Sequence, residues 1–167
     1  NNTQRGRIIL SGSSNTGVGV NVTGGTVSTL GAGNVSILGT SNNTFGIRIG
    51  TSINVTNANI TGFSNAGTGV QFAAGTNNIS GNSTVTGSSA QGSGVVFAGG
   101  TLTLNSTAGN TTCITGITGN STSSTVYGLK LSGTLPTVSG GAGTIIYSGT
   151  GNAGAGIFVG NGTNNIT

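Results

Sequence analysis

A glycine followed by an apolar residue, any residue and a second apolar residue recurs six times along the chain. The leading glycines are 23 to 34 residues apart. A repeat with a period in this range is typical of stacked repeat arrays, so the sequence predicts a solenoid. The six copies are Gly19-Val20-Asn21-Val22, Gly46-Ile47-Arg48-Ile49, Gly69-Val70-Gln71-Phe72, Gly94-Val95-Val96-Phe97, Gly128-Leu129-Lys130-Leu131 and Gly156-Ile157-Phe158-Val159.

Two further markers accompany each copy. The upstream marker is an apolar residue followed by any residue and a glycine. The downstream marker is a Gly-Thr pair that precedes another alternating run, such as Leu102-Thr103-Leu104. Alternating runs bounded by turn residues indicate strands, so each repeat is predicted to carry three short strands. The upstream markers end at Gly12, Gly39, Gly62, Gly87, Gly116 and Gly149, and the downstream pairs begin at Gly25, Gly50, Gly75, Gly100, Gly133 and Gly162. In the fifth repeat, residues 120–124 are predicted to be a loop insertion.

These patterns predict one all-β domain over residues 1–167, a right-handed parallel β-helix (β-solenoid) of about six coils with three short strands per coil. The approximate coils are 1–33, 34–58, 59–82, 83–109, 110–142 and 143–167, with uncapped ends. The hand follows the general rule for parallel crossovers. Equivalent residues of successive coils stack in columns about 4.7–4.9 Å apart. The recurrent glycines are expected at corners, where positive φ or a close backbone approach is needed.

Three inward columns follow from the alternation, and they place Phe72 over Phe97 as a stacked pair. The first is Val20, Ile47, Val70, Val95, Leu129 and Ile157. The second is Val22, Ile49, Phe72, Phe97, Leu131 and Val159. The third is Leu10, Ile37, Ile60, Val85, Ile114 and Tyr147. The outward column between the first two is Asn21, Arg48, Gln71, Val96, Lys130 and Phe158.

Composition narrows the possible chemistry. The chain has no Asp, Glu or His, four Lys or Arg residues and a single Cys. General acid–base catalysis needs a titratable group near neutral pH, so we predict that the protein is not an enzyme and has no catalytic residue, cofactor or metal site. Cys113 has no histidine to activate it and is predicted to point outward. Neutral columns also avoid like-charge repulsion between adjacent coils.

The same composition argues against several partners. No apolar run is long enough for a membrane span. The four cations do not cluster along one face as nucleic-acid binding requires, so no nucleic acid is expected. One surface combines aromatic and cationic residues and is a candidate binding face for a glycan or for a host or abiotic surface: Phe45, Arg48, Tyr127, Lys130 and Phe158. Asn-X-Ser/Thr triplets such as Asn21-Val22-Thr23 are interpreted as turn and ladder residues, with sugar attachment as the alternative.

A rank of threonines leaves an ice-binding solenoid as another alternative. This rank is Thr26, Thr51, Thr76, Thr101, Thr134 and Thr163. The second rank that such a face needs is irregular: Ser28, Ile53, Asn78, Thr103, Pro136 and Asn165. Bracing of the corner after each glycine is the simpler and favoured role for the threonine hydroxyls.

The repeat style resembles a known group of proteins. Ile60-Thr61-Gly62, Gly67-Thr68-Gly69-Val70-Gln71-Phe72 and Gly75-Thr76-Asn77-Asn78-Ile79-Ser80 are similar to the β-solenoid repeats of bacterial filamentous-haemagglutinin-like exoproteins, the large adhesins and autotransporter-type passengers. The resemblance implies export to the extracellular space or cell surface, a right-handed β-helix, and a stalk or fibre role in adhesion, aggregation or biofilm. The predicted partner is the protein itself, through end-to-end stacking or adjoining coils of a longer chain.

Overall fold

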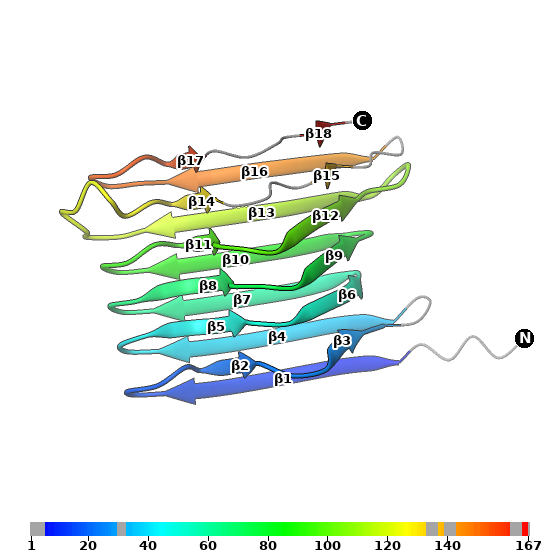
Figure 1. Ribbon diagram of the computed structural model, residues 1–167, viewed down its shortest axis with the longest axis horizontal. Helices are drawn as coiled ribbons and strands as arrows, with labels where there is room; N and C mark the ends of the chain where they lie inside the picture. Colours follow the sequence, from blue (N-terminus) through cyan, green and yellow to red (C-terminus); the bar gives the residue numbers. More distant parts are fainter. Residues whose placement is uncertain (1–5, 30–32, 133–136, 139–142, 161–164, 167) are drawn as a thin grey trace, which may run out of the picture.

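The computed structural model describes residues 6–29, 33–132, 137–138, 143–160 and 165–166. The chain winds as an all-β, right-handed parallel solenoid with three parallel six-stranded sheets (Figure 1). This confirms the predicted fold class. We call three consecutive strands, one from each sheet, a coil. The described residues contain no helix long and apolar enough to cross a membrane.

The first sheet holds the longest strands. In their spatial order they are β1 (Arg7–Ser14), β4 (Asn34–Ser41), β7 (Ala58–Ser64), β10 (Ser83–Ser89), β13 (Thr111–Thr118) and β16 (Thr144–Thr150). The strands of the second sheet are β2 (Val20–Val22), β5 (Phe45–Ile49), β8 (Thr68–Phe72), β11 (Val95–Phe97), β14 (Leu129–Leu131) and β17 (Ile157–Val159). Those of the third sheet are β3 (Thr26–Ser28), β6 (Ser52–Thr56), β9 (Thr76–Ser80), β12 (Thr101–Asn105), β15 (Thr137–Val138) and β18 (Asn165–Ile166).

Strand register confirms the three inward columns. In the first sheet Leu10 pairs with Ile37, and the column continues in register to Tyr147. In the second sheet the columns that begin at Val20 and Val22 also run in register through all six strands. Each column therefore joins matching apolar side chains of successive coils, as the repeat pattern predicts.

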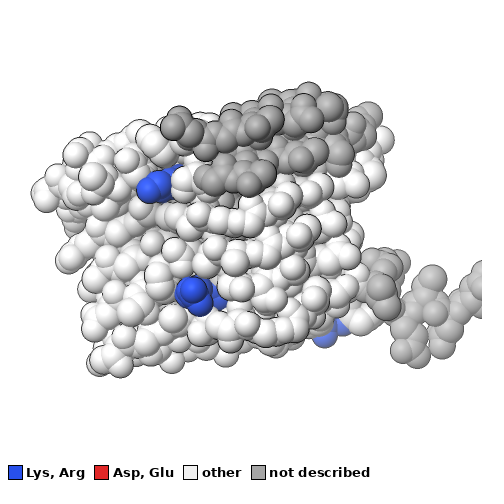
Figure 2. Space-filling view, viewed as in Figure 1, with Lys and Arg blue, Asp and Glu red and all other residues white. Residues whose placement is uncertain are grey.

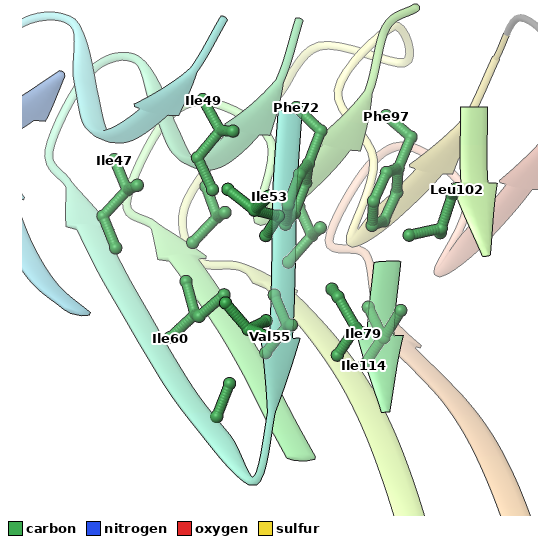
Figure 3. Packing of buried hydrophobic residues seen from close by; sticks show 14 of the residues in the cluster. Ile47, Ile49, Ile53, Val55, Ile60, Phe72, Ile79, Phe97, Leu102 and Ile114 are labelled. Atoms are coloured by element: carbon green, nitrogen blue, oxygen red, sulfur yellow. The ribbon is translucent and has the colours of Figure 1, made fainter. Parts of the chain in front are cut away.

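The middle coils contain an apolar core (Figure 3). Ile47, Ile49 and Ile60 are fully buried. Phe72 and Phe97 stack with their ring centroids 4.4 Å apart and their planes 9° from parallel, which confirms the predicted aromatic pair. The end of the solenoid differs, because Ile157 is 43% exposed and Val159 is 50% exposed although both occupy inward columns.

Two glycine columns meet where the first and second sheets approach each other. Gly62 lies within β7, not at a corner, and a Cβ atom added to it would lie 2.2 Å from the carbonyl oxygen of Gly69. Gly39 and Gly46 face each other in the same way one coil earlier. These positions need glycine because the backbones are too close for any side chain. Positive φ occurs elsewhere, for example at Gly75 and Gly100 of the Gly-Thr pairs.

Buried hydroxyls close the turn between the first and second sheets. We call the stacked residues Ser14, Ser41, Ser64, Ser89 and Thr118 the hydroxyl column. The Ser89 hydroxyl accepts a hydrogen bond from the Gly92 amide at 2.8 Å and donates one to the Gly67 carbonyl of the preceding coil at 2.6 Å. Ser64 makes the equivalent pair of bonds with Gly67 and Thr44. The hydroxyls of Ser41, Ser64 and Ser89 thus hold their own turns and tie them to the turn of the preceding coil.

The third sheet corrects the predicted threonine rank. The corner before β6 is one residue shorter than the corner before β9, so Thr26 pairs with Ser52 and not with Thr51. The register places Asn54 beside Ser28, while Ile53 points inward and is fully buried. Ile53 therefore does not belong to an outer rank. Of the remaining rank members, Thr134, Pro136 and Thr163 lie outside the described residues.

One inward position of the third sheet is polar. Asn77 stacks on Ile53, pairs with Leu102 on its other side, and is 1% exposed. Its amide nitrogen donates a weak hydrogen bond to the Ala74 carbonyl at 3.3 Å, and its amide oxygen has no partner. A buried polar atom without a partner lowers stability, so Asn77 is a weak point in the core.

Candidate functional site

Three of the five predicted site residues form one cluster on the outer face of the second sheet. Lys130 lies at the centre of β14, and Phe158 lies directly beside it on β17. Tyr127 precedes β14, and its ring centroid is 4.7 Å from that of Phe158, with the ring planes tilted by 31°. The Lys130 ammonium lies over both rings, 5.3 Å from the Tyr127 centroid and 5.9 Å from the Phe158 centroid. We call these three residues the aromatic–cation cluster.

The local sequence explains how the cluster is held. Leu129 and Leu131 point into the core and are nearly or fully buried, so the alternation of β14 turns Lys130 outward. The Tyr127 amide donates to the Ser93 hydroxyl at 3.2 Å, and the Tyr127 carbonyl accepts from the Gly94 amide at 3.1 Å. Two contacts to the preceding coil therefore fix the backbone from which the Tyr127 ring projects.

The longer loop of the fifth coil leads directly to this cluster. Residues between β13 and β14 include the predicted insertion at 120–124, and these two strands are separated by more residues than β10 and β11 are. The loop is anchored to the next coil by a hydrogen bond from the Asn152 amide nitrogen to the Ser121 carbonyl at 3.1 Å. The insertion thus alters the turn beside the cluster and leaves the strand register unchanged.

The other two predicted site residues lie apart from the cluster. Arg48 occupies the same outward column as Lys130 but is three coils away, which is about 14 Å at the usual strand spacing. Phe45 begins β5 and pairs with Thr68 in the neighbouring strand. Gln71 and Val96 lie between the two cations in the column. Figure 2 shows small, separate blue patches and no red patch, as expected for a chain with few cations and no acidic residue.

The titratable residues outside the cluster include one partly buried tyrosine that packs against the core. Tyr147 belongs to an inward column of the first sheet, and burial raises the pKa of its phenol to about 12 because the charged form is poorly solvated there. Its hydroxyl has no hydrogen-bond partner. Cys113 is half-buried and pairs with Thr84 and Ile146, and its sulfur lies 3.5 Å from the Thr115 hydroxyl.

The outer face of the first sheet carries exposed apolar side chains that the sequence analysis did not select. These are Ile9, Leu38, Phe63, Ile117 and Ile146. They occupy three different columns, and no two of them are paired with each other on adjacent strands. Phe63 and Ile117 each directly follow the glycine of an upstream marker. That position in the repeat is the signal that would have identified these two residues.

A shallow polar hollow lies at the end of this face, beside Phe63. It has a volume of about 200 Å³ and is lined by Ser13, Ser14, Asn15, Thr40, Ser41, Asn42 and Phe63. The Asn42 amide donates a hydrogen bond to the Asn15 side-chain oxygen across it. The lining has no charged group, and the Ser14 and Ser41 hydroxyls in it bond to the backbone of the turn.

Comparison with known proteins leaves the family open. No family model, no curated protein and no solved structure matches the chain.

Proposed function

We propose that this protein is a structural repeat protein that builds an extracellular fibre or adhesin stalk by stacking coil on coil. The observation that carries the proposal is the exposure of the inward columns at the last coil. Ile157 and Val159 are 43% and 50% exposed, whereas Ile47 and Ile49 in the same columns are fully buried. Another coil of the same repeat would cover them as each middle coil covers its neighbour.

The backbone at the two ends supports the same proposal. Within the described residues, β1, β2 and β3 each have one strand neighbour, as do β16, β17 and β18. Each therefore presents one row of backbone donors and acceptors that a further parallel strand would pair. All three sheets end on the same coil, so one added coil would extend all three ladders together. The covering coil would come from a second copy or from adjoining coils of a longer chain.

The surface chemistry also favours a passive, extended scaffold. With no acidic side chain and four cations, stacked columns contain almost no like-charge contacts between adjacent coils. The resemblance of the repeats to filamentous-haemagglutinin-like exoproteins supports a location outside the cell and a role in adhesion or biofilm. A structural role of this kind needs no catalytic centre.

The experiment is to examine the purified chain by negative-stain electron microscopy and analytical ultracentrifugation over a concentration series. Stacking predicts filaments whose width equals the cross-section of one solenoid. Val159→Lys places a charge in the exposed apolar column and should give monomers. Ser148→Lys, on the exposed outer face of the same coil, adds the same charge away from the stacking surface and should assemble as the native chain does. A native chain that stays monodisperse at high concentration, or equal assembly of all three proteins, would overturn stacking between copies and leave only adjoining coils of a longer chain to cover the end.

A further inference from the structure

We propose that the aromatic–cation cluster binds an anionic sugar residue of a linear acidic polysaccharide that lies along the outward column of the second sheet. The cluster combines two features that such a ligand needs. The Tyr127 and Phe158 rings offer apolar faces on which the C–H face of a pyranose can pack, and the Lys130 ammonium lies beside both rings. The Lys130 ammonium would bind the carboxylate or sulfate of that sugar.

The charge of the ligand follows from the composition. Lys130 cannot pair with an acidic side chain, because the chain contains no Asp or Glu. Contact with two aromatic rings removes part of the water around the ammonium without supplying an anion. A cation in such a half-buried position forms strong, charge-assisted hydrogen bonds with an incoming anionic group. The two rings restrict the anion to one that is carried on a flat, partly apolar body.

The linear shape of the ligand follows from the register. Arg48, Gln71, Val96, Lys130 and Phe158 form one straight column along the stack. Arg48 is about 14 Å from Lys130 along this column, with a neutral amide and a small apolar side chain between them. A polymer with anionic groups at intervals can reach both cations, whereas a single sugar can reach only one of them. Arg48 is therefore the second contact for the same chain of sugars.

This site does not depend on the proposed stacking. The cluster lies on the side of the solenoid, whereas stacking uses the apolar columns and strand edges at its ends. Failure of the chain to form filaments would leave the binding prediction unchanged, and loss of binding would leave the stacking prediction unchanged.

The test measures binding of oligogalacturonate, a carboxylated polymer, and heparin fragments, a sulfated one, by isothermal titration calorimetry at low salt, with dextran as the neutral control. Lys130→Gln should weaken binding by about tenfold through loss of the charge-assisted contact. Phe158→Leu should weaken it by about tenfold as well, because leucine cannot offer a ring face. Arg7→Gln removes the same charge from the other side of the solenoid, at the start of β1, and should change the affinity by less than about twofold.

Several outcomes would overturn the proposal. If Arg7→Gln and Lys130→Gln weaken binding equally, the interaction reflects net charge and not the cluster. If Phe158→Leu binds as the native chain does, the aromatic rings are not part of the site. If the native chain binds neither acidic polymer, or binds dextran equally well, the cluster does not select an acidic sugar. Circular dichroism of each variant shows whether the β-solenoid is intact.

Discussion

At the scale of single residues, the hydroxyl column shows how a polar side chain can be buried at low cost in an otherwise apolar interior. Ser64 and Ser89 use their hydroxyls as both donor and acceptor, and both are nearly or fully buried. Buried polar groups that are fully hydrogen-bonded stabilise a fold, whereas unpaired ones destabilise it. The column ends at Thr118, whose hydroxyl has no partner. The longer loop between β13 and β14 begins directly after Thr118.

Ser89 and its neighbour Ser88 provide a matched test of this role. Ser89→Ala leaves the Gly92 amide and the Gly67 carbonyl without their partner, so the free energy of unfolding should fall by about 1–3 kcal/mol. Ser88→Ala, on the outer face of the same strand, should change it by less than about 0.5 kcal/mol. Urea denaturation followed by circular dichroism measures both. Equal effects would contradict the assigned role of the hydroxyl column.

The phenol of Tyr147 makes stability depend on pH in the alkaline range. Its pKa is raised from 10.0 to about 12 by burial, so the folded state holds the proton more tightly than the unfolded state. The contribution of the protonated phenol to stability is complete below pH 10. The free energy of unfolding should fall as the pH rises from 10 to 12. Tyr147→Phe should weaken this fall and leave neutral-pH stability equal or higher by about 1 kcal/mol, since it removes an unpartnered hydroxyl. The comparison of native and variant denaturation curves isolates Tyr147, and identical alkaline losses would refute its role.

At the scale of strands and turns, the repeat pattern could predict the inward columns because a parallel solenoid aligns like with like. Val20, Ile47 and Val70 have the same spacing to their leading glycines, and the structure aligns them. The corner before β6 could not be predicted in the same way. Gly50-Thr51 looks equivalent to Gly75-Thr76, but the corner before β6 is one residue shorter, so burial of Ile53 decides the register. Side-chain burial on a strand overrides a turn motif that is displaced by one residue.

The glycine columns lead to a prediction at this same scale. Gly62→Ala places a Cβ atom 2.2 Å from the Gly69 carbonyl oxygen, so two strands must separate, and the free energy of unfolding should fall by about 1–3 kcal/mol. Gly24→Ala meets nothing within 4 Å, and φ of Gly24 is not positive, so stability should rise by about 0.4–1 kcal/mol. Thermal denaturation of the two variants checks this contrast. A tolerated Gly62→Ala would mean that the two sheets do not approach each other as described.

At the scale of the whole molecule, the solenoid separates two surfaces with different chemistry. The ends carry unpaired strand edges and exposed apolar residues such as Val159, which suit stacking. The side of the second sheet carries the aromatic–cation cluster, which suits a ligand. Such a division would let a fibre grow without covering the sites along its length. It would also let a chain with almost no charge bind the proposed acidic ligand at Lys130.

Sequence reasoning could predict part of this candidate site. Lys130 and Phe158 follow adjacent repeat glycines, so the register alone places them together. Tyr127 lies after an insertion, and its distance from Phe158 depends on a turn that no repeat rule describes. Phe45 and Arg48 share the residue types of the cluster but belong to the second coil, and the predicted outward column already places Arg48 three coils from Lys130.

The measurement that tests the account most directly is a thiol crosslink between adjacent coils. Thr84 is paired with Cys113, and in-register neighbours have Cα atoms about 4.8 Å apart, within the range of a disulfide. Mild oxidation of Thr84→Cys should give an intramolecular disulfide, identified by mass spectrometry of proteolytic fragments. Asn59→Cys, one coil farther along the same column, and Thr86→Cys, beside Thr115, should not crosslink. Crosslinking at Thr86→Cys or Asn59→Cys in preference to Thr84→Cys would contradict the in-register stacking of coils.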